Sequence, residues 1–292
     1  MGNLCSAAID LGGTKIISAC FSPGMELLGR PVETPTRARS RPGEIVDNIC
    51  SNLEQSLSLN GISAKELGRL GLGVPTTIQY EKGLIDLSPN LPTMSDFPLG
   101  RLLEDRLGVP VAMENDANCF ALGEAVHGAG RGFSSCCGIT LGTGLGLGIV
   151  LGGELYRGSS CCAGEIWKSW HGDDLLENHA SGPALAGRYL QITGNACSGE
   201  QVYRKALKAE PEALEVFQDL GRALGQGLSY LVNILDPGIV VFGGSAAQAF
   251  DLFIGPLEEE IARYRVARNA TRFVGSALGK LAPLFGAASL KG

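Results

Sequence analysis

Apolar residues recur along this chain with two spacings, and their order predicts an α/β protein. Short apolar runs with strand character lie at 4–10, 15–21, 69–75, 109–113, 135–142, 145–151 and 238–243. Apolar residues at helical spacing predict helices near 43–58, 97–107, 116–127, 181–190, 199–208, 211–234 and 246–265. Because strands and helices alternate in both halves, we expect a sheet core in each half.

One local pattern occurs twice, at residues 8–15 (AIDLGGTK) and 139–146 (ITLGTGLG). Each copy predicts two strands joined by a tight turn. Glycines let a backbone approach a ligand closely, and Thr14 and Thr143 add hydroxyls beside free N–H groups, a combination that suits phosphate. A hairpin without a ligand is the alternative for either turn alone. Neither a P-loop nor a dinucleotide-binding glycine pattern is present, so the two turns favour a nucleotide held between duplicated halves.

A third motif, residues 109–118 (VPVAMENDAN), predicts a strand that leads directly into a helix. Asp116 would lie at this junction, where side chains point into a cleft. Capping of the helix by Asn115 or Asp116 is the alternative. Further motifs follow at 163–165 (AGE), 176–183 (LENHASGP) and 235–245 (LDPGIVVFGGS).

Together the motifs at 10–15, 114–118, 142–146, 163–165 and 241–244 resemble those of the ROK family of sugar kinases and repressors, in the family's order. The resemblance runs from about residue 5 to the C-terminus. It implies an α/β, two-lobed, actin-like ATPase fold, which is a duplicated ribonuclease-H-like fold. The lobes would comprise 1–115, joined by a C-terminal helix within 283–292, and 116–282.

The resemblance also implies a glucokinase-like activity, the ATP-dependent phosphorylation of a hexose primary hydroxyl. Asp116 would be the general base, which as an aspartate is ionised at neutral pH. The sugar hydroxyls would be bound by Asn90 (within 88–92, SPNLP), Asn115, Glu165 and Glu177. Asp10 would orient Mg2+ through water. The phosphates would face Gly12, Gly13, Thr14, Lys15, Gly142, Thr143 and Gly144, and the adenosine would border Gly243 and Gly244. ATP or polyphosphate as the donor is left open.

The chain departs from the family pattern after the AGE motif. Lys168 stands where many members have a histidine that binds sugar and zinc, and the cysteines of the zinc site are missing. We therefore expect no zinc site and a narrowed or shifted sugar preference. Lys168 could donate to a sugar oxygen, pair with Glu165 or turn outward. A zinc site from His171, His179 and a carboxylate is conceivable, but solvated loop residues are the favoured interpretation. Thr76 stands where kinases of the family often have glycine, and this also puts glucose as the substrate in doubt.

Composition adds limits on location and partners. A net charge of −6 gives no reason to expect nucleic acid, and no apolar run is long enough to span a membrane. Nine cysteines without a C-x-x-C favour reduced, mostly buried thiols. We expect a cytoplasmic homodimer with a small-molecule sugar as its partner. A sugar-binding sensor or regulator with little kinase activity is the alternative, although Asp10 comes too early for the repressors' N-terminal winged helix.

Overall fold

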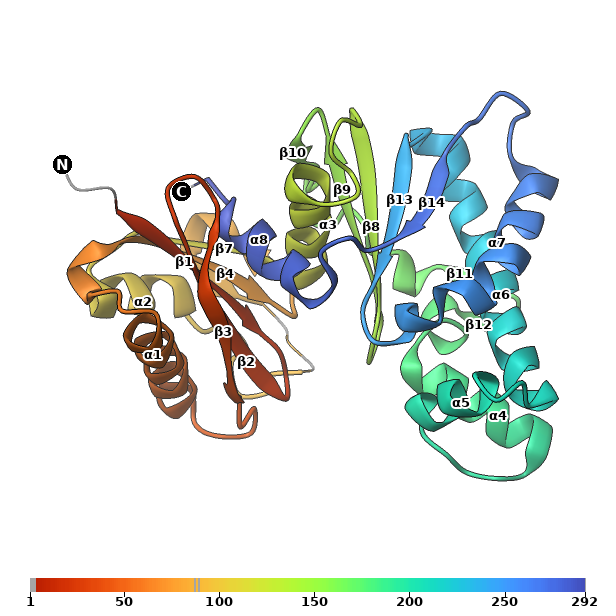
Figure 1. Ribbon diagram of the computed structural model, residues 1–292, viewed down its shortest axis with the longest axis horizontal. Helices are drawn as coiled ribbons and strands as arrows, with labels where there is room; N and C mark the ends of the chain where they lie inside the picture. Colours follow the sequence, from red (N-terminus) through yellow and green to blue (C-terminus); the bar gives the residue numbers. More distant parts are fainter. Residues whose placement is uncertain (1–3, 87, 89, 292) are drawn as a thin grey trace. The chain divides into compact units, whose positions relative to one another are not determined.

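The computed structural model describes residues 4–86, 88 and 90–291, so Pro89 of the predicted motif 88–92 lies outside the described residues. These residues divide into two compact units, each built on a five-stranded sheet (Figure 1). The first unit contains the residues up to His127, the segment 157–162 and the residues from Leu281 onward. The second unit contains 128–156 and 163–280.

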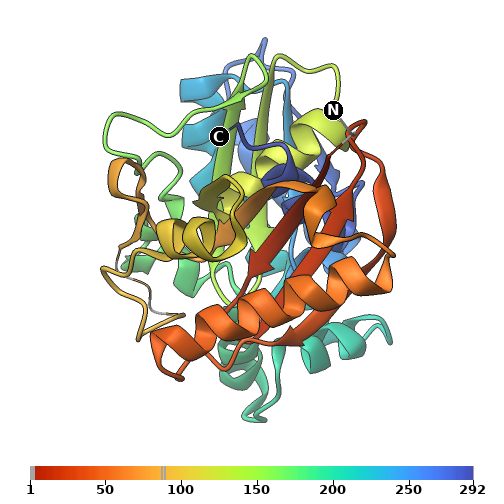
Figure 2. The ribbon, with the colours of Figure 1, turned by 90° about the vertical axis from the view of Figure 1, so that its left-hand side faces the viewer.

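The sheet of the first unit has the strand order β3-β2-β1-β4-β7. Its strands are β1 (Cys5–Leu11), β2 (Lys15–Phe21), β3 (Leu27–Pro35), β4 (Leu67–Val74) and β7 (Val111–Asn115). β1, β2 and β3 are antiparallel, whereas β4 and β7 continue parallel to β1. Alternate residues such as Ile9 and Leu11 face a core shared with α1 (Pro42–Leu59) and α2 (Leu99–Leu107). Figure 2 shows α1 running across the strands on this face.

The opposite face of the same sheet is covered by α3 (Asp116–His127) and α8 (Ala282–Ala288). Small residues allow this close packing. A Cβ at Gly71 of β4 would clash with the backbone of Ala287, and a Cβ at Gly286 would clash with the backbone of Cys119. The glycines therefore bring α3 and α8 directly against the strands and against each other.

The second unit repeats the topology of the first. Its sheet has the order β10-β9-β8-β13-β14, formed by β8 (Ser135–Leu141), β9 (Leu145–Leu151), β10 (Glu154–Leu155), β13 (Ile239–Gly243) and β14 (Arg272–Gly275). The first three strands are again antiparallel and the last two parallel. The common order and strand directions confirm a duplicated α/β architecture.

Helices of the second unit enclose a buried core that includes Phe217, Leu224 and Phe253. They are α4 (Gly182–Thr193), α5 (Gly199–Ala206), α6 (Pro211–Leu235) and α7 (Phe250–Tyr264). Short elements complete the fold: the strand pairs β5 (Ile78–Gln79) with β6 (Leu84–Ile85) and β11 (Trp170–His171) with β12 (Asp174–Leu175), and the 3-10 turns η1 (Ala64–Glu66), η2 (Tyr80–Lys82), η3 (Ile166–Lys168), η4 (Leu176–Asn178), η5 (Ala246–Ala249) and η6 (Gly279–Leu281).

Three sheet strands and one helix start differ from the sequence prediction. β3, β10 and β14 were not expected, and all three are edge strands with exposed residues. The helix predicted over 246–265 begins as the 3-10 turn η5, and α7 starts only at Phe250. Buried Ala247, Ala249 and Phe253 continue one apolar pattern through both, so spacing alone did not separate them. Within the described part of the chain, no helix is both long and apolar enough to cross a membrane.

Candidate functional site

The first glycine turn, residues 12–14, joins β1 to β2 as the sequence predicts. The Gly12 amide donates a hydrogen bond to the Lys15 carbonyl at 2.9 Å, which closes the turn. A Cβ at Gly13 would lie only 3.0 Å from the Asn90 carbonyl oxygen. The structure thus brings Asn90, a predicted sugar-binding residue, against the predicted phosphate turn.

Asp10 precedes this turn on the sheet face that α3 and α8 cover. Burial raises the pKa of Asp10 to about 6, and the positive charge of Lys15 acts in the opposite direction. Lys15 Nζ itself forms an exposed ion pair with Glu33 at 3.0 Å. A carboxylate whose charge is disfavoured by burial would be stabilised by a nearby cation, so Asp10 fits the role of an oxygen donor toward hydrated Mg2+.

The junction predicted between strand and helix is present, since β7 ends at Asn115 and α3 begins at Asp116. Asn115 Oδ1 accepts hydrogen bonds from the amides of Ala117 and Asn118 at 2.9 and 3.2 Å, and its Nδ2 donates to the Thr76 carbonyl at 3.3 Å. Asp116 Oδ1 accepts from the Ala117 amide at 2.8 Å. The capping role that the sequence left open is therefore present at Asn115, in addition to any sugar contact.

Glu114 is fully buried directly before this junction. Its Oε1 accepts hydrogen bonds from the Tyr80 hydroxyl, the Asn115 amide at 2.9 Å and Asn118 Nδ2 at 2.9 Å. Its Oε2 accepts from Arg157 Nε at 2.6 Å, and the Arg157 guanidinium lies 5.1 Å from the centroid of the Tyr80 ring. Four donors thus saturate one buried carboxylate.

Strand register places Asp10 and Glu114 in one row across the first sheet. Asp10 pairs with Gly73 of β4, and Gly73 pairs with Glu114 of β7. Neighbouring strands lie about 4.8 Å apart, so the two acidic residues are separated by about 10 Å. Cys119 packs on Gly73 between them, and burial together with the charges of Glu114, Asp10 and Asp116 raises its pKa. A neutral thiol thus fills the space among three carboxylates.

The second glycine turn joins β8 to β9 in the other unit. The Gly142 amide donates to the Gly144 carbonyl at 3.0 Å, and the Gly142 carbonyl accepts from the Gly182 amide at 2.7 Å. Gly182 is the first residue of α4, so the positive end of that helix dipole adjoins the turn, as suits an anion. Glu177 Oε2 accepts from the Leu145 amide at 2.8 Å. The predicted sugar-binding Glu177 thus holds the end of the second glycine turn.

Gly243 and Gly244 bring the end of β13 against the end of β8, beside the second glycine turn. Gly244 has φ = +89°, and a Cβ there would clash with the backbone of Leu141, the last residue of β8. The predicted adenosine-bordering residues therefore adjoin the second glycine turn within one unit.

Glu165 and Lys168 are connected through the indole of Trp167. Trp167 Nε1 donates to the Glu165 carboxylate, and Lys168 Nζ lies 4.9 Å from the centroid of the Trp167 ring. Lys168 forms no ion pair with Glu165 among the described residues. Lys168 is exposed, and its ammonium group contacts the face of the Trp167 ring instead of pairing with Glu165.

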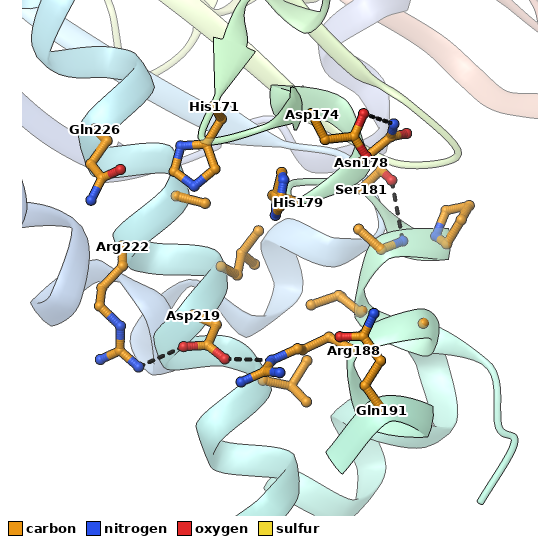
Figure 3. A pocket seen from close by; sticks show the side chains of 17 residues that line it. His171, Asp174, Asn178, His179, Ser181, Arg188, Gln191, Asp219, Arg222 and Gln226 are labelled. Atoms are coloured by element: carbon orange, nitrogen blue, oxygen red, sulfur yellow. Dashed lines mark hydrogen bonds and ion pairs between the residues drawn. The ribbon is translucent and has the colours of Figure 1, made fainter. Parts of the chain in front are cut away.

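A separate cavity of about 620 Å³ lies in the second unit between the β11–β12 pair, α4 and α6 (Figure 3). The rings of His171 and His179 meet edge to face with their centroids 4.6 Å apart, and Arg188 and Arg222 both pair with Asp219, at 2.7 and 2.6 Å. Burial and the neighbouring His179 lower the pKa of His171. None of the predicted sugar or nucleotide residues lines this cavity. Over residues 4–86, 88 and 90–291, no three His, Cys, Asp or Glu side chains are grouped to hold a metal.

Comparison with known proteins decides the family. The ROK family model matches residues 6–291. The chain belongs to the ROK family. It is 31% identical to a glucokinase of Streptomyces coelicolor, over 97% of this chain and 96% of that protein. It is also 32% identical to a putative xylose repressor of Caldicellulosiruptor sp., over 73% of this chain and 59% of the repressor.

Among solved structures, a ROK family glucokinase from Streptomyces griseus in complex with glucose and AMPPNP superimposes with a TM-score of 0.83. The two sequences are 27% identical, and the match covers 97% of this chain and 98% of the other. Together with the duplicated sheets, this similarity confirms the predicted actin-like ATPase fold.

Three residues of this ROK protein's candidate site escaped the sequence analysis. Glu114 was part of a quoted motif, and a charged residue in an otherwise apolar strand was a signal that could have identified it. Tyr80 and Arg157 lie 34 and 43 residues from Glu114 in sequence, and no local pattern marks either.

Proposed function

We propose that this protein is a sugar kinase that transfers the terminal phosphoryl group of ATP to the primary hydroxyl of a hexose. The β7–α3 junction carries the proposal, because an aspartate begins a helix directly after a strand of the first sheet. Similarity to a glucokinase over nearly the whole chain, and to a structure that binds glucose and AMPPNP, supports the substrate classes. With identities near 30%, the individual sugar stays open.

In this proposal Asp116 accepts the proton of the sugar hydroxyl as its oxygen attacks the γ-phosphorus. Phosphoryl transfer depends mainly on alignment of the acceptor and compensation of phosphate charge, and a positioned base adds to the rate. Asn90 and Asn115 bind sugar hydroxyls from the first unit, and Glu165 and Glu177 accept hydrogen bonds from others. The indole N–H of Trp167 orients Glu165 for that role.

The two glycine turns face the nucleotide phosphates in this proposal. Gly12, Gly13 and Lys15 belong to the first turn, Gly142 and Gly144 belong to the second, and the exposed hydroxyls of Thr14 and Thr143 add donors. Gly243 and Gly244 border the adenosine. The N-terminus of α4 beside Gly142 adds a positive partial charge.

Asp10 holds Mg2+ through water. The bound ion would neutralise charge on the phosphates of the nucleotide. Asp10 suits this role because it lies beside the first glycine turn and because a bound cation would stabilise its buried negative charge.

A sugar-binding regulator is the second candidate, favoured by the similarity to a putative repressor. Both candidates bind sugar, but a regulator would release no ADP.

We further propose that the protein acts in the cytoplasm as a homodimer. Sedimentation analysis of the purified protein would test the dimer.

The test is a coupled ADP-release assay with Mg2+ across hexoses, N-acetylhexosamines and ketoses, with ATP and with polyphosphate as donors. We expect sugar-dependent turnover with ATP, and a phosphate ester on the primary hydroxyl in the NMR spectrum of the product. Sugar binding by calorimetry without turnover for any sugar would contradict the kinase proposal and favour the regulator.

A further inference from the structure

Glu114 is surrounded by four donors from three separate segments of the first unit. Besides the Asn115 amide, they come from η2 (Tyr80), the first turn of α3 (Asn118) and the segment 157–162 (Arg157). A guanidinium, a backbone amide and a side-chain NH2 can only donate, so the Glu114 carboxyl oxygens are the acceptors in these bonds. A buried carboxylate of this kind is stable only while it is paired and fully hydrogen-bonded.

Two of these donors lie on either side of the proposed base. Glu114 Oε1 binds the Asn115 amide, one residue before Asp116, and Asn118 Nδ2, two residues after it. One oxygen atom thereby bonds the backbone amide before Asp116 and the Asn118 side chain after it. The direction of the Asp116 side chain then depends on the position of the Glu114 carboxylate.

Arg157 holds that carboxylate from a distant part of the sequence. Its Nε donates to Oε2 at 2.6 Å, and its guanidinium packs over the Tyr80 ring, whose hydroxyl donates to Oε1. Arg157 also opens the segment 157–162, which belongs to the first unit although the chain before and after it belongs to the second.

We propose that Glu114, held by Arg157 and Tyr80, is a positioning residue that aims the Asp116 carboxylate at the sugar hydroxyl. The proposal rests on the proposed function, in which Asp116 is the base. It assigns no substrate contact to Glu114 or Arg157. Loss of the Arg157 bond would let the carboxylate shift, and the Asn115 amide would lose its acceptor.

The first test is Arg157→Lys, which keeps the charge but loses the planar fork that bonds Glu114 and stacks on Tyr80. Because misplacement of a catalytic group by about 1 Å costs up to about 100-fold, we expect kcat to fall about 10- to 100-fold with KM for ATP nearly unchanged. Arg204→Lys is the matched control, since Arg204 forms an exposed ion pair with Glu200 at 2.6 Å. Tyr80→Phe, which deletes a single hydroxyl, should lower kcat in the same way with less risk to folding. Unchanged kcat in both Arg157→Lys and Tyr80→Phe overturns the proposal.

A double-mutant cycle with Asp116→Asn separates positioning from general damage. If Arg157 acts through Asp116, Arg157→Lys lowers kcat in the wild type but adds little further loss to Asp116→Asn. An equal loss in both backgrounds overturns the positioning role and leaves Asp116 as the base. Near-normal turnover of Asp116→Asn alone overturns the base assignment, and the positioning proposal with it.

Hydrogen exchange supplies a readout that does not require turnover. We expect peptides covering 111–122 to exchange faster in Arg157→Lys and Tyr80→Phe than in the wild type and Arg204→Lys, while peptides of the second unit are unchanged. Identical exchange in all four proteins would show that the network does not hold the junction, and would overturn the proposal even if no sugar substrate had been found.

Discussion

At the scale of single residues, Asp10 has a titration that can be measured. Its pKa of about 6 in the folded protein exceeds the ordinary value of 3.8 because of burial. The folded state therefore binds the Asp10 proton more tightly than the unfolded state does. As the pH rises through 6, Asp10 loses this proton, and the buried negative charge lowers the free energy of unfolding. Asp10→Asn should raise that free energy at pH 8 by up to about 3 kcal/mol, with the gain disappearing toward pH 4.

The measurement is urea unfolding between pH 4 and 8, without nucleotide and with a chelator present. Asp105→Asn, at an exposed position of α2, is the matched control and should change the free energy of unfolding little at any pH. A constant difference between Asp10→Asn and the wild type across this range would contradict the assigned titration.

Residue types and spacing could predict which segments of the site matter, but not every partner inside it. The Gly-rich turns and the Asn115–Asp116 junction are local in sequence, so a short motif identifies them. The acceptor role of Glu177 toward Leu145, and the bonds of Glu114 to Tyr80 and Arg157, join residues more than 30 positions apart. Such pairs depend on tertiary packing, which no local pattern records.

At the scale of elements, the crossing of α3 and α8 depends on two glycines. A Cβ at Gly286 would clash with the Cys119 backbone, and one at Gly123 would clash with the Ala282 backbone. Gly286→Ala should therefore lower the free energy of unfolding by about 1–3 kcal/mol through overpacking. Gly187→Ala, in the interior of α4 with nothing within 4 Å, should instead raise it by about 0.5–1 kcal/mol. Stabilisation by both substitutions, measured by urea unfolding, would show that α3 and α8 do not cross this closely.

The same elements show how far apolar spacing can predict secondary structure. α1, α3 and α6 are regular amphipathic or buried segments, and the predicted helices match them to within a residue or two. β3 contains Arg30, Pro31 and Glu33 and lies at the sheet edge, where one side has no partner strand and polar residues are tolerated. Its identity as a strand comes from pairing with β2, which only the folded sheet provides.

At the scale of the whole molecule, we predict that the protein folds and works without structural zinc. The chain lacks the family's cysteine ligands and has Lys168 in place of the histidine, and a structural zinc site needs four suitable ligands. Elemental analysis of protein purified without chelator should find well below one zinc per chain. Activity that is lost on chelation and restored by zinc but not by magnesium would contradict this prediction.

We propose above that this ROK protein is a kinase whose base is Asp116 at the β7–α3 junction. The most direct test is kcat of Asp116→Asn on the best sugar of the panel, with ATP affinity measured by calorimetry on the same preparation. Because loss of a general base typically costs about 10²- to 10⁴-fold in rate, we predict a fall of that size with ATP affinity and thermal stability unchanged. Near-normal turnover by the folded variant would contradict the assignment of Asp116 as the general base.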